Sequence, residues 1–121
     1  MHIAALVAVA LNALIHLYIV ALEMFLWSRA TRVFAIPRDQ RENPLLKTML
    51  KNQGLYNGFL VAGLVWGLVY PDPVVGQQIQ LFFLGCIAVA GLYGAVTASP
   101  RILLVQTVPA SIAAALVLLA A

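Results

Sequence analysis

The apolar run Ile3–Trp27 contains two ionisable side chains, His16 and Glu23. Groups that can carry charge are expensive to bury in hydrocarbon unless they are paired or face a water-filled cavity, so they usually mark functional sites. A desolvated carboxyl group can hold a proton near neutral pH, and an imidazole can take up or release one. These two residue types therefore predict acid–base chemistry at a site within the membrane.

A helix through this run places its polar side chains on one face. Asn12, His16, Glu23 and Trp27 follow one another at positions i, i+4, i+11 and i+15. At about 100° per residue, the four side chains fall on a stripe about 60° wide. We expect this stripe to form one side of a polar site, with Trp27 as an apolar wall for a ligand.

A second group of polar residues opens the next long apolar segment. Its side chains recur at four-residue intervals and form a polar quadrant near one end of that helix; they are Asn52, Gln53, Tyr56 and Asn57. Amides can orient a carbonyl, hydroxyl or epoxide oxygen, and a tyrosine hydroxyl can donate to a developing oxyanion. The quadrant therefore adds substrate-orienting groups to the acid–base pair of the first helix.

The two helices are expected to run antiparallel because they are neighbours in the chain. Glu23 would then lie level with Asn52 and Gln53. His16 would lie about 10 Å deeper, at about 1.5 Å per residue, near the level of Asn57. Since His16 and Glu23 are too far apart for a direct hydrogen bond, a water molecule, an amide or a ligand is expected between them.

The leading hypothesis is a membrane protein that binds, and also isomerises or rearranges, a small lipophilic molecule without a cofactor. We predict Glu23 as the acid–base group, His16 as a second proton carrier and Tyr56 as the oxyanion donor. Further residues are expected to orient or wall the substrate: Asn12, Trp27, Asn52, Gln53, Asn57 and Trp66. No metal-binding cluster is predicted.

Other interpretations stay open at this point. Glu23 could reach the interface or pair with Arg29, His16 could bind a backbone carbonyl, and the amides could only link helices, at about 0.6 kcal/mol each. A lone membrane carboxyl group also suits a proton-coupled carrier or exporter, and His16 suits an axial ligand of haem. The plainest alternative is a structural or assembly partner.

Composition and length define the elements that must position these residues. The 121 residues are 64% hydrophobic and 9% charged, with a mean hydropathy of +0.99, which is typical of an integral membrane protein. The chain predicts a single all-α domain, residues 1–121, built as a bundle of four transmembrane helices. The expected spans are residues 3–27, 45–70, 76–98 and 102–121, with a basic loop at 28–44.

The placement of charge predicts the orientation. Six of the seven Lys and Arg residues lie between Arg29 and Lys51. A membrane surface explains this clustering better than a nucleic acid, so no nucleic-acid partner is expected. By the positive-inside rule, loops 28–44 and 99–101 are cytoplasmic and both chain termini lie outside.

Local signals predict where the helices begin and end. Asn43-Pro44 is a helix start, with Asn43 as the cap and Pro44 at the first helical position. The string Pro71-Asp72-Pro73 ends the second span. Pro109 is expected to bend the fourth span, where three side chains form a weaker polar face: Gln106, Thr107 and Ser111.

Small residues predict close packing of the helices. The second span contains glycines four residues apart, which allow backbones to approach; they are Gly54 with Gly58 and Gly63 with Gly67. Four helices of this length also expose a large apolar surface. We therefore expect a homo-oligomer embedded in the lipid bilayer.

Two strings carry a resemblance to a known family. The strings HLYIVALEMFLW (His16–Trp27) and NQGLYNGFLVAGLVWG (Asn52–Gly67) resemble the signature segments of the bacterial family called domain of unknown function 1304. The resemblance covers essentially the whole chain in length and layout, and the matching positions are His16, Glu23, Trp27, Asn52, Gln53, Tyr56, Asn57 and Gly58. It implies a small four-span protein of the bacterial inner membrane, and it implies no activity.

Overall fold

The structure is a computed structural model that describes residues 2–121, and every regular element in this range is a helix. In chain order the elements are α1 (His2–Met24), α2 (Trp27–Val33), the 3-10 helix η1 (Arg38–Gln40), α3 (Pro44–Val69), α4 (Pro73–Thr97), the π-helical segment η2 (Leu103–Thr107) and α5 (Val108–Ala120). The prediction of an all-α fold is confirmed for this part of the chain.

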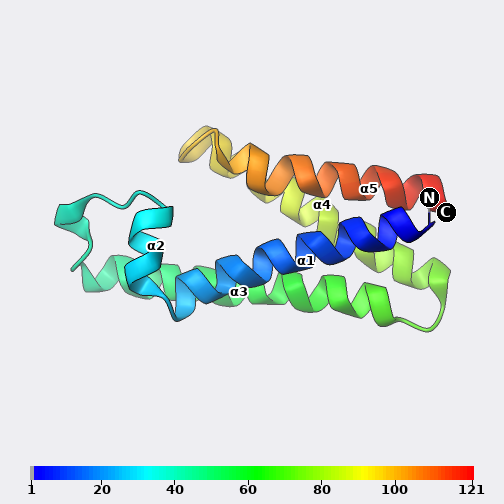
Figure 1. The fold of residues 1–121 in the computed structure, drawn as a ribbon, viewed down its shortest axis with the longest axis horizontal. Helices are drawn as coiled ribbons and strands as arrows, with labels where there is room; N and C mark the ends of the chain where they lie inside the picture. Colours follow the sequence, from blue (N-terminus) through cyan, green and yellow to red (C-terminus); the bar gives the residue numbers. More distant parts are fainter. Residues whose placement is uncertain (1) are drawn as a thin grey trace.

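Four long helical segments lie side by side along the length of the molecule (Figure 1). α1 packs against α3 and α5, and α4 packs against α3 and against the segment formed by η2 and α5. The N- and C-terminal ends of the chain lie together at one end of the molecule, and α2 lies at the opposite end. Each long segment therefore has two neighbours.

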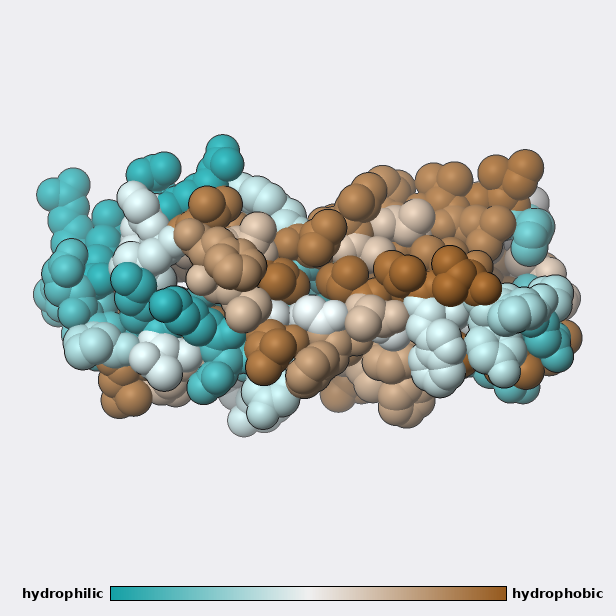
Figure 2. Space-filling model, turned by 90° about the horizontal axis from the view of Figure 1, so that it is seen from below, coloured by the Kyte–Doolittle hydropathy of each residue, from teal (hydrophilic) through white to brown (hydrophobic). Residues whose placement is uncertain are grey.

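Three of these segments are long and apolar enough to cross a membrane: His2–Met24, Pro73–Thr97 and Leu103–Ala120. α3 is not among them because its first half carries polar residues from Lys47 to Asn57. Figure 2 shows hydrophobic side chains over most of the length and hydrophilic ones gathered mainly at the end that holds α2. Such a distribution identifies a membrane protein.

The predicted helix start at Asn43-Pro44 is confirmed, and α4 begins at Pro73, three residues before the expected residue 76. The side chain of Asn43 accepts hydrogen bonds from the backbone amides of Leu45 and Leu46, and Pro44 opens α3. Asp72 caps α4 in the same manner through the amide of Val74. Caps of this type satisfy amides that have no partner inside the helix, which is why these two sequence signals are reliable.

The first connection differs from the expectation. α1 ends at Met24, whereas the predicted span continues to Trp27, and the amides of Phe25 and Leu26 both donate to the carbonyl of Ala21. The predicted loop 28–44 is partly helical, because α2 begins at Trp27 and turns Ala30 and Thr31 into the molecule. Residues 27–33 contain neither proline nor glycine, so nothing in their backbone opposes a helix.

The helix of the fourth segment has π geometry shortly before Pro109. A bend is expected at Pro109, and the structure has the wide turn of η2, Leu103–Thr107, directly before it. A proline ring clashes with the carbonyl four residues earlier, here that of Val105. A π turn moves that carbonyl out of the way, since its hydrogen bonds span five residues in place of four.

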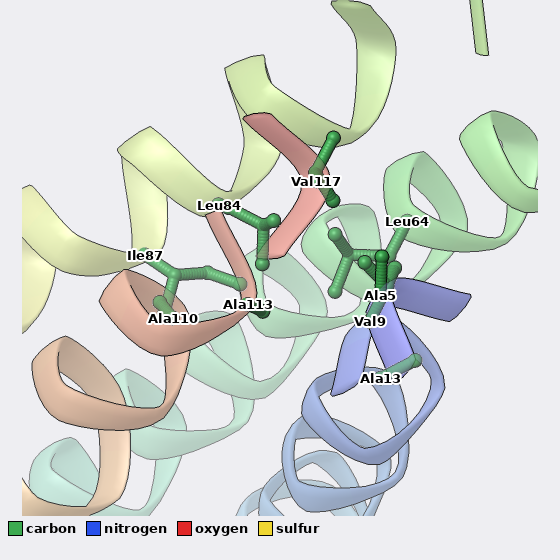
Figure 3. Packing of buried hydrophobic residues seen from close by; sticks show 9 residues of the cluster. All are labelled: Ala5, Val9, Ala13, Leu64, Leu84, Ile87, Ala110, Ala113 and Val117. Atoms are coloured by element: carbon green, nitrogen blue, oxygen red, sulfur yellow. The ribbon is translucent and has the colours of Figure 1, made fainter. Parts of the chain in front are cut away.

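The apolar core lies in the half of the molecule that holds the chain ends. It is built from small and branched side chains of all four long segments (Figure 3), namely Ala5, Val9, Ala13, Leu64, Leu84, Ile87, Ala110, Ala113 and Val117. Alanines on α1 and α5 let these two helices approach closely, since they add little bulk between backbones. Along α1, Asn12 lies at the edge of this core, and His16 and Glu23 follow it.

Candidate functional site

Three of the four side chains on the predicted α1 stripe are buried. Asn12 is 2% exposed, His16 is 0% exposed and Glu23 is 7% exposed. Polar side chains buried to this degree normally have hydrogen-bond partners, so the partners of each one define what the cluster can do. They are supplied by α3 at one end of the stripe and by the η2–α5 segment at the other.

Glu23 is held by an amide from α3. The Nδ2 of Asn57 donates to Oε1 of Glu23 at 2.6 Å, and Asn57 is itself 7% exposed. Gly54 makes this approach of the two helices possible, because a Cβ at that position would lie 2.5 Å from Cγ of Met24 and 3.0 Å from Cβ of Glu23. The carboxyl group is thus buried against a neutral partner.

Arg29 does not serve as the counter-ion that the sequence left open. Its guanidinium carbon lies 6.0 Å from the centre of the Tyr18 ring, in a cation–π arrangement on the outer side of α1. Arg29 is exposed, while Glu23 faces α3. Within residues 2–121, the burial of Glu23 is therefore compensated by the hydrogen bond from Asn57.

His16 is fixed in one tautomer by its two neighbours. Its Nδ1 lies 2.9 Å from the backbone carbonyl of Asn12, and a carbonyl only accepts, so Nδ1 carries the hydrogen. Its Nε2 lies 3.4 Å from Nε2 of Gln106 in η2, an amide donor. The second ring nitrogen, Nε2, is therefore the one presented to Gln106.

Asn12 joins α1 to α5 and leaves one atom without a partner. Its Nδ2 donates to the carbonyls of Ala8, at 2.9 Å, and Pro109, at 3.1 Å. Its Oδ1 is buried and accepts no hydrogen bond within the described residues. A buried acceptor of this kind is uncommon in native structures and marks a position where a donor from a bound molecule would be stabilised.

The quadrant on α3 does not face this cluster as a whole. Asn57 is buried, but Asn52, Gln53 and Tyr56 are exposed, and Tyr56 instead meets Phe59 edge-to-face at 5.9 Å. Glu23 packs against Gly54, close to the expected level of Asn52 and Gln53, but α3 is turned so that only Asn57 of the quadrant reaches its carboxyl group. α3 extends beyond the end of α1, and its first residues lie beside α2.

The two tryptophans also lie away from the cluster. Trp27 is half-buried in the connection, where its indole N–H donates to the carbonyl of Arg41 at 2.9 Å. Trp66 is 53% exposed and belongs to an apolar groove of about 310 Å³ between α3 and α4, lined also by Val75, Gln78, Ile79, Phe82 and Phe83. Neither tryptophan forms a wall for a ligand beside His16 and Glu23.

The comparison with known proteins decides the family. The model of the family described as Protein of unknown function (DUF1304) matches residues 10–118. The chain belongs to this family. It is also similar to the uncharacterized protein YpaA of Lactococcus lactis subsp. lactis (strain IL1403), with 36% identity over 98 residues that make up 79% of this chain and 81% of the relative. No solved structure matches the chain.

Gln106 is the residue of this DUF1304 member that sequence reasoning undervalued. The sequence predicts only a weaker polar face for it, shared with Thr107 and Ser111. In the structure Gln106 contacts His16, the hydroxyl of Thr107 donates to the carbonyl of Ala88 at 3.0 Å, and Ser111 is exposed. The nearby Pro109 was the available signal, since prolines inside helices displace their neighbours.

Haem does not fit His16 in this DUF1304 member. An axial ligand must present its free nitrogen to iron, yet the imidazole is fully buried and its Nε2 faces Gln106. A macrocycle would have to displace η2 to reach it. Within residues 2–121 no group of three His, Cys, Asp or Glu side chains is arranged to hold a metal ion.

Replacing Asn12 by leucine is expected to leave the free energy of unfolding within about 1 kcal/mol of the wild type, or to raise it. The substitution removes the unpartnered Oδ1, and the two carbonyls that Asn12 contacts lie inside helices with their own amide donors. Denaturant-dependent unfolding in detergent micelles measures the change. A loss above about 2 kcal/mol contradicts this account and shows that the contact with Pro109 is essential.

Proposed function

We propose that this protein binds a small lipophilic molecule at the polar cluster of α1, and that Glu23 and His16 move protons on it in an isomerisation or a related rearrangement. The observation that carries the proposal is the Glu23 carboxyl group, 7% exposed and hydrogen-bonded to the neutral amide of Asn57. Buried carboxyl groups without a cation are expensive in a membrane and are kept where they act.

His16 supports a role in proton transfer. Its Nδ1–H is held by the carbonyl of Asn12, so its Nε2 is the nitrogen that can accept a proton. Gln106 can follow either state, because its amide presents a donor to neutral Nε2 and, after turning over, an acceptor to Nε2–H. Asn12 Oδ1 adds an acceptor for a hydroxyl or amide of the ligand.

The membrane arrangement belongs to the same proposal. Both chain ends lie at one end of the molecule (Figure 1), which supports an even number of crossings. With three helices apolar enough to span, α3 provides the return crossing through its apolar second half. The cluster of Lys and Arg between Arg29 and Lys51 supports a cytoplasmic position for that end, with the termini outside, in the inner membrane of a bacterium.

A lipophilic carbodiimide tests whether a small apolar molecule reaches a protonated Glu23. Dicyclohexylcarbodiimide adds to a protonated carboxyl group, and away from water the adduct rearranges to a stable N-acylurea. In the folded protein in bilayers we expect labelling of Glu23, found by peptide mass spectrometry, that declines as the pH rises and the acid loses its proton. Glu23→Gln should abolish the adduct at this position.

The chain offers internal controls for this experiment. Asp39 and Glu42 are exposed, so a water-soluble carbodiimide activates them while leaving Glu23 unlabelled. If Glu23 resists the lipophilic reagent in the folded protein but reacts after unfolding, the proposed site does not admit lipophilic molecules. Equal labelling of Glu23 by both reagents also contradicts the proposal, because it means that the carboxyl group opens to water.

A further inference from the structure

The end of the molecule opposite the chain termini carries a concentrated positive charge. We call residues 27–51 the basic end; it contains six Lys and Arg residues but only two acidic ones, Asp39 and Glu42. Five of the six cations are exposed and Arg41 is half-buried. The segment directly follows α1, a helix able to cross a membrane, so its charges lie where a bilayer has its headgroups.

α2 presents its cations together with apolar side chains. Ala30 and Thr31 are buried against the molecule, and the opposite face of the helix carries Arg29, Arg32 and Val33, all exposed. Phe25, just before α2, is 76% exposed, and Phe34, just after it, is 38% exposed. A surface that mixes guanidinium groups with exposed phenyl rings matches the boundary between phosphates and acyl chains.

The fold also holds this surface in place. The ammonium group of Lys47 lies 5.9 Å from the centre of the Trp27 ring, and the indole N–H of Trp27 donates to the carbonyl of Arg41. Nε of Arg41 in turn donates to the carbonyl of Ile36 at 2.9 Å. These contacts tie α2, the connection and the start of α3 together, so that the backbone that carries the cations is ordered before a ligand binds.

We propose that the basic end binds the phosphate headgroups of anionic phospholipids, with Arg29 and Arg32 as the principal contacts and Phe25 and Val33 among the acyl chains. Guanidinium groups suit this ligand because they bind phosphate oxygens in pairs. The neighbouring apolar side chains favour a phospholipid over free phosphate, which has no apolar part. The interaction uses neither His16 nor Glu23, so it stands or falls separately from the function proposed above.

Two tryptophans at different places in the fold provide the readout. Trp27 lies in the basic end, and Trp66 lies in the groove between α3 and α4. Trp66→Phe protein is reconstituted in phosphatidylcholine bilayers with a minor fraction of phosphatidylglycerol. One of the two lipids at a time carries brominated chains, which quench the fluorescence of Trp27 when they lie near it. Trp27→Phe protein reports the surroundings of Trp66 in the same bilayers.

We expect brominated phosphatidylglycerol to quench Trp27 more strongly than brominated phosphatidylcholine at equal mole fraction. The association constant of phosphatidylglycerol at Trp27 should exceed that of phosphatidylcholine by more than about fivefold. One Lys or Arg near an anionic surface contributes a factor of about this size. Trp66 should show a ratio near one. Replacing Arg29 and Arg32 by glutamine should lower the Trp27 ratio by about fivefold or more, whereas Arg101→Gln, in the other turn, should leave it unchanged.

Three results overturn the proposal. The first is equal quenching of Trp27 by both brominated lipids in Trp66→Phe protein that keeps Arg29 and Arg32. The second is an equal effect of Arg101→Gln, which would mean that net charge alone attracts the lipid. The third is displacement of brominated phosphatidylglycerol by millimolar inorganic phosphate but not by chloride at the same ionic strength, which would mark a site for free phosphate. Circular dichroism verifies that the glutamine variants keep their helices.

Discussion

Asn57→Leu is expected to lower the free energy of unfolding by about 1–3 kcal/mol. The substitution removes the amide that donates to Oε1 of Glu23 at 2.6 Å and leaves that oxygen without a donor between α1 and α3. Leucine fills a similar volume, so the loss comes from the missing hydrogen bond rather than from a cavity. Denaturant titration in detergent micelles, followed by circular dichroism, measures the change.

The double variant Glu23→Met with Asn57→Leu tests whether the loss comes from the unpaired carboxyl group of Glu23. Replacing both partners by apolar side chains is far less costly than removing one, so the double variant should recover most of the loss. Asn12→Leu is the matched control, since it makes the same substitution at a buried asparagine whose removal leaves no acceptor stranded. Stability of Asn57→Leu within about 0.5 kcal/mol of the wild type would contradict a buried pair.

Gly76→Ala is expected to destabilise the protein by about 1–3 kcal/mol through overpacking. A Cβ at Gly76 would lie 2.7 Å from the carbonyl oxygen of Gly67, so α3 and α4 could not keep their present distance. The hydrogen bond from Nε2 of Gln80 to the same carbonyl, 3.0 Å long and buried, would be disturbed as well. Thermal unfolding in micelles should show a lower midpoint.

Gly85→Ala provides the control on the same helix. A Cβ there has no heavy atom of another helix within 4 Å, so the expected effect is the gain in helix propensity, up to about 1 kcal/mol. The difference between the two alanine variants therefore measures the helix contact and cancels the propensity. If both variants gain stability equally, the backbones of α3 and α4 do not meet at Gly67 and Gly76.

Sequence patterns within one helix predicted the structure well. Asn43 and Pro44 define a helix start because a cap acts on amides only two or three residues away. The burial of Asn12, His16 and Glu23 follows from the helical repeat, which needs no knowledge of other elements. These features are local, so the amino-acid sequence contains all the information they require.

The relation between helices was not predictable in the same way. Asn57, rather than Asn52 or Gln53, meets Glu23 because α3 turns the face that carries Gly54 and Asn57 toward α1. The sequence of α3 contains polar side chains on more than one face, so its pattern alone could not reveal which face meets α1. The exposure of Tyr56 follows from the same rotation about the helix axis.

The contact between His16 and Gln106 depends on a second feature that the helical repeat does not contain. Gln106 lies in η2, where the turns are wider than the 3.6 residues assumed in reading a helical face. Its neighbour Thr107 donates to Ala88 of α4 in the same segment. Irregular turns of this kind are placed by packing, here around Pro109, and only a structure assigns the side chains that they carry.

The wide turn Leu103–Thr107 also affects which side chains a one-residue insertion or deletion would move. A π turn holds one residue more than an α turn, so η2 is equivalent to a single-residue insertion in an otherwise regular helix. One residue corresponds to a rotation of about 100° about the helix axis. Deleting one residue directly after Gln106 would leave Ala110, Ala113 and Val117 in the core while turning Gln106 and the preceding side chains to a different neighbour. Evolution could therefore change what His16 faces by gaining or losing one codon.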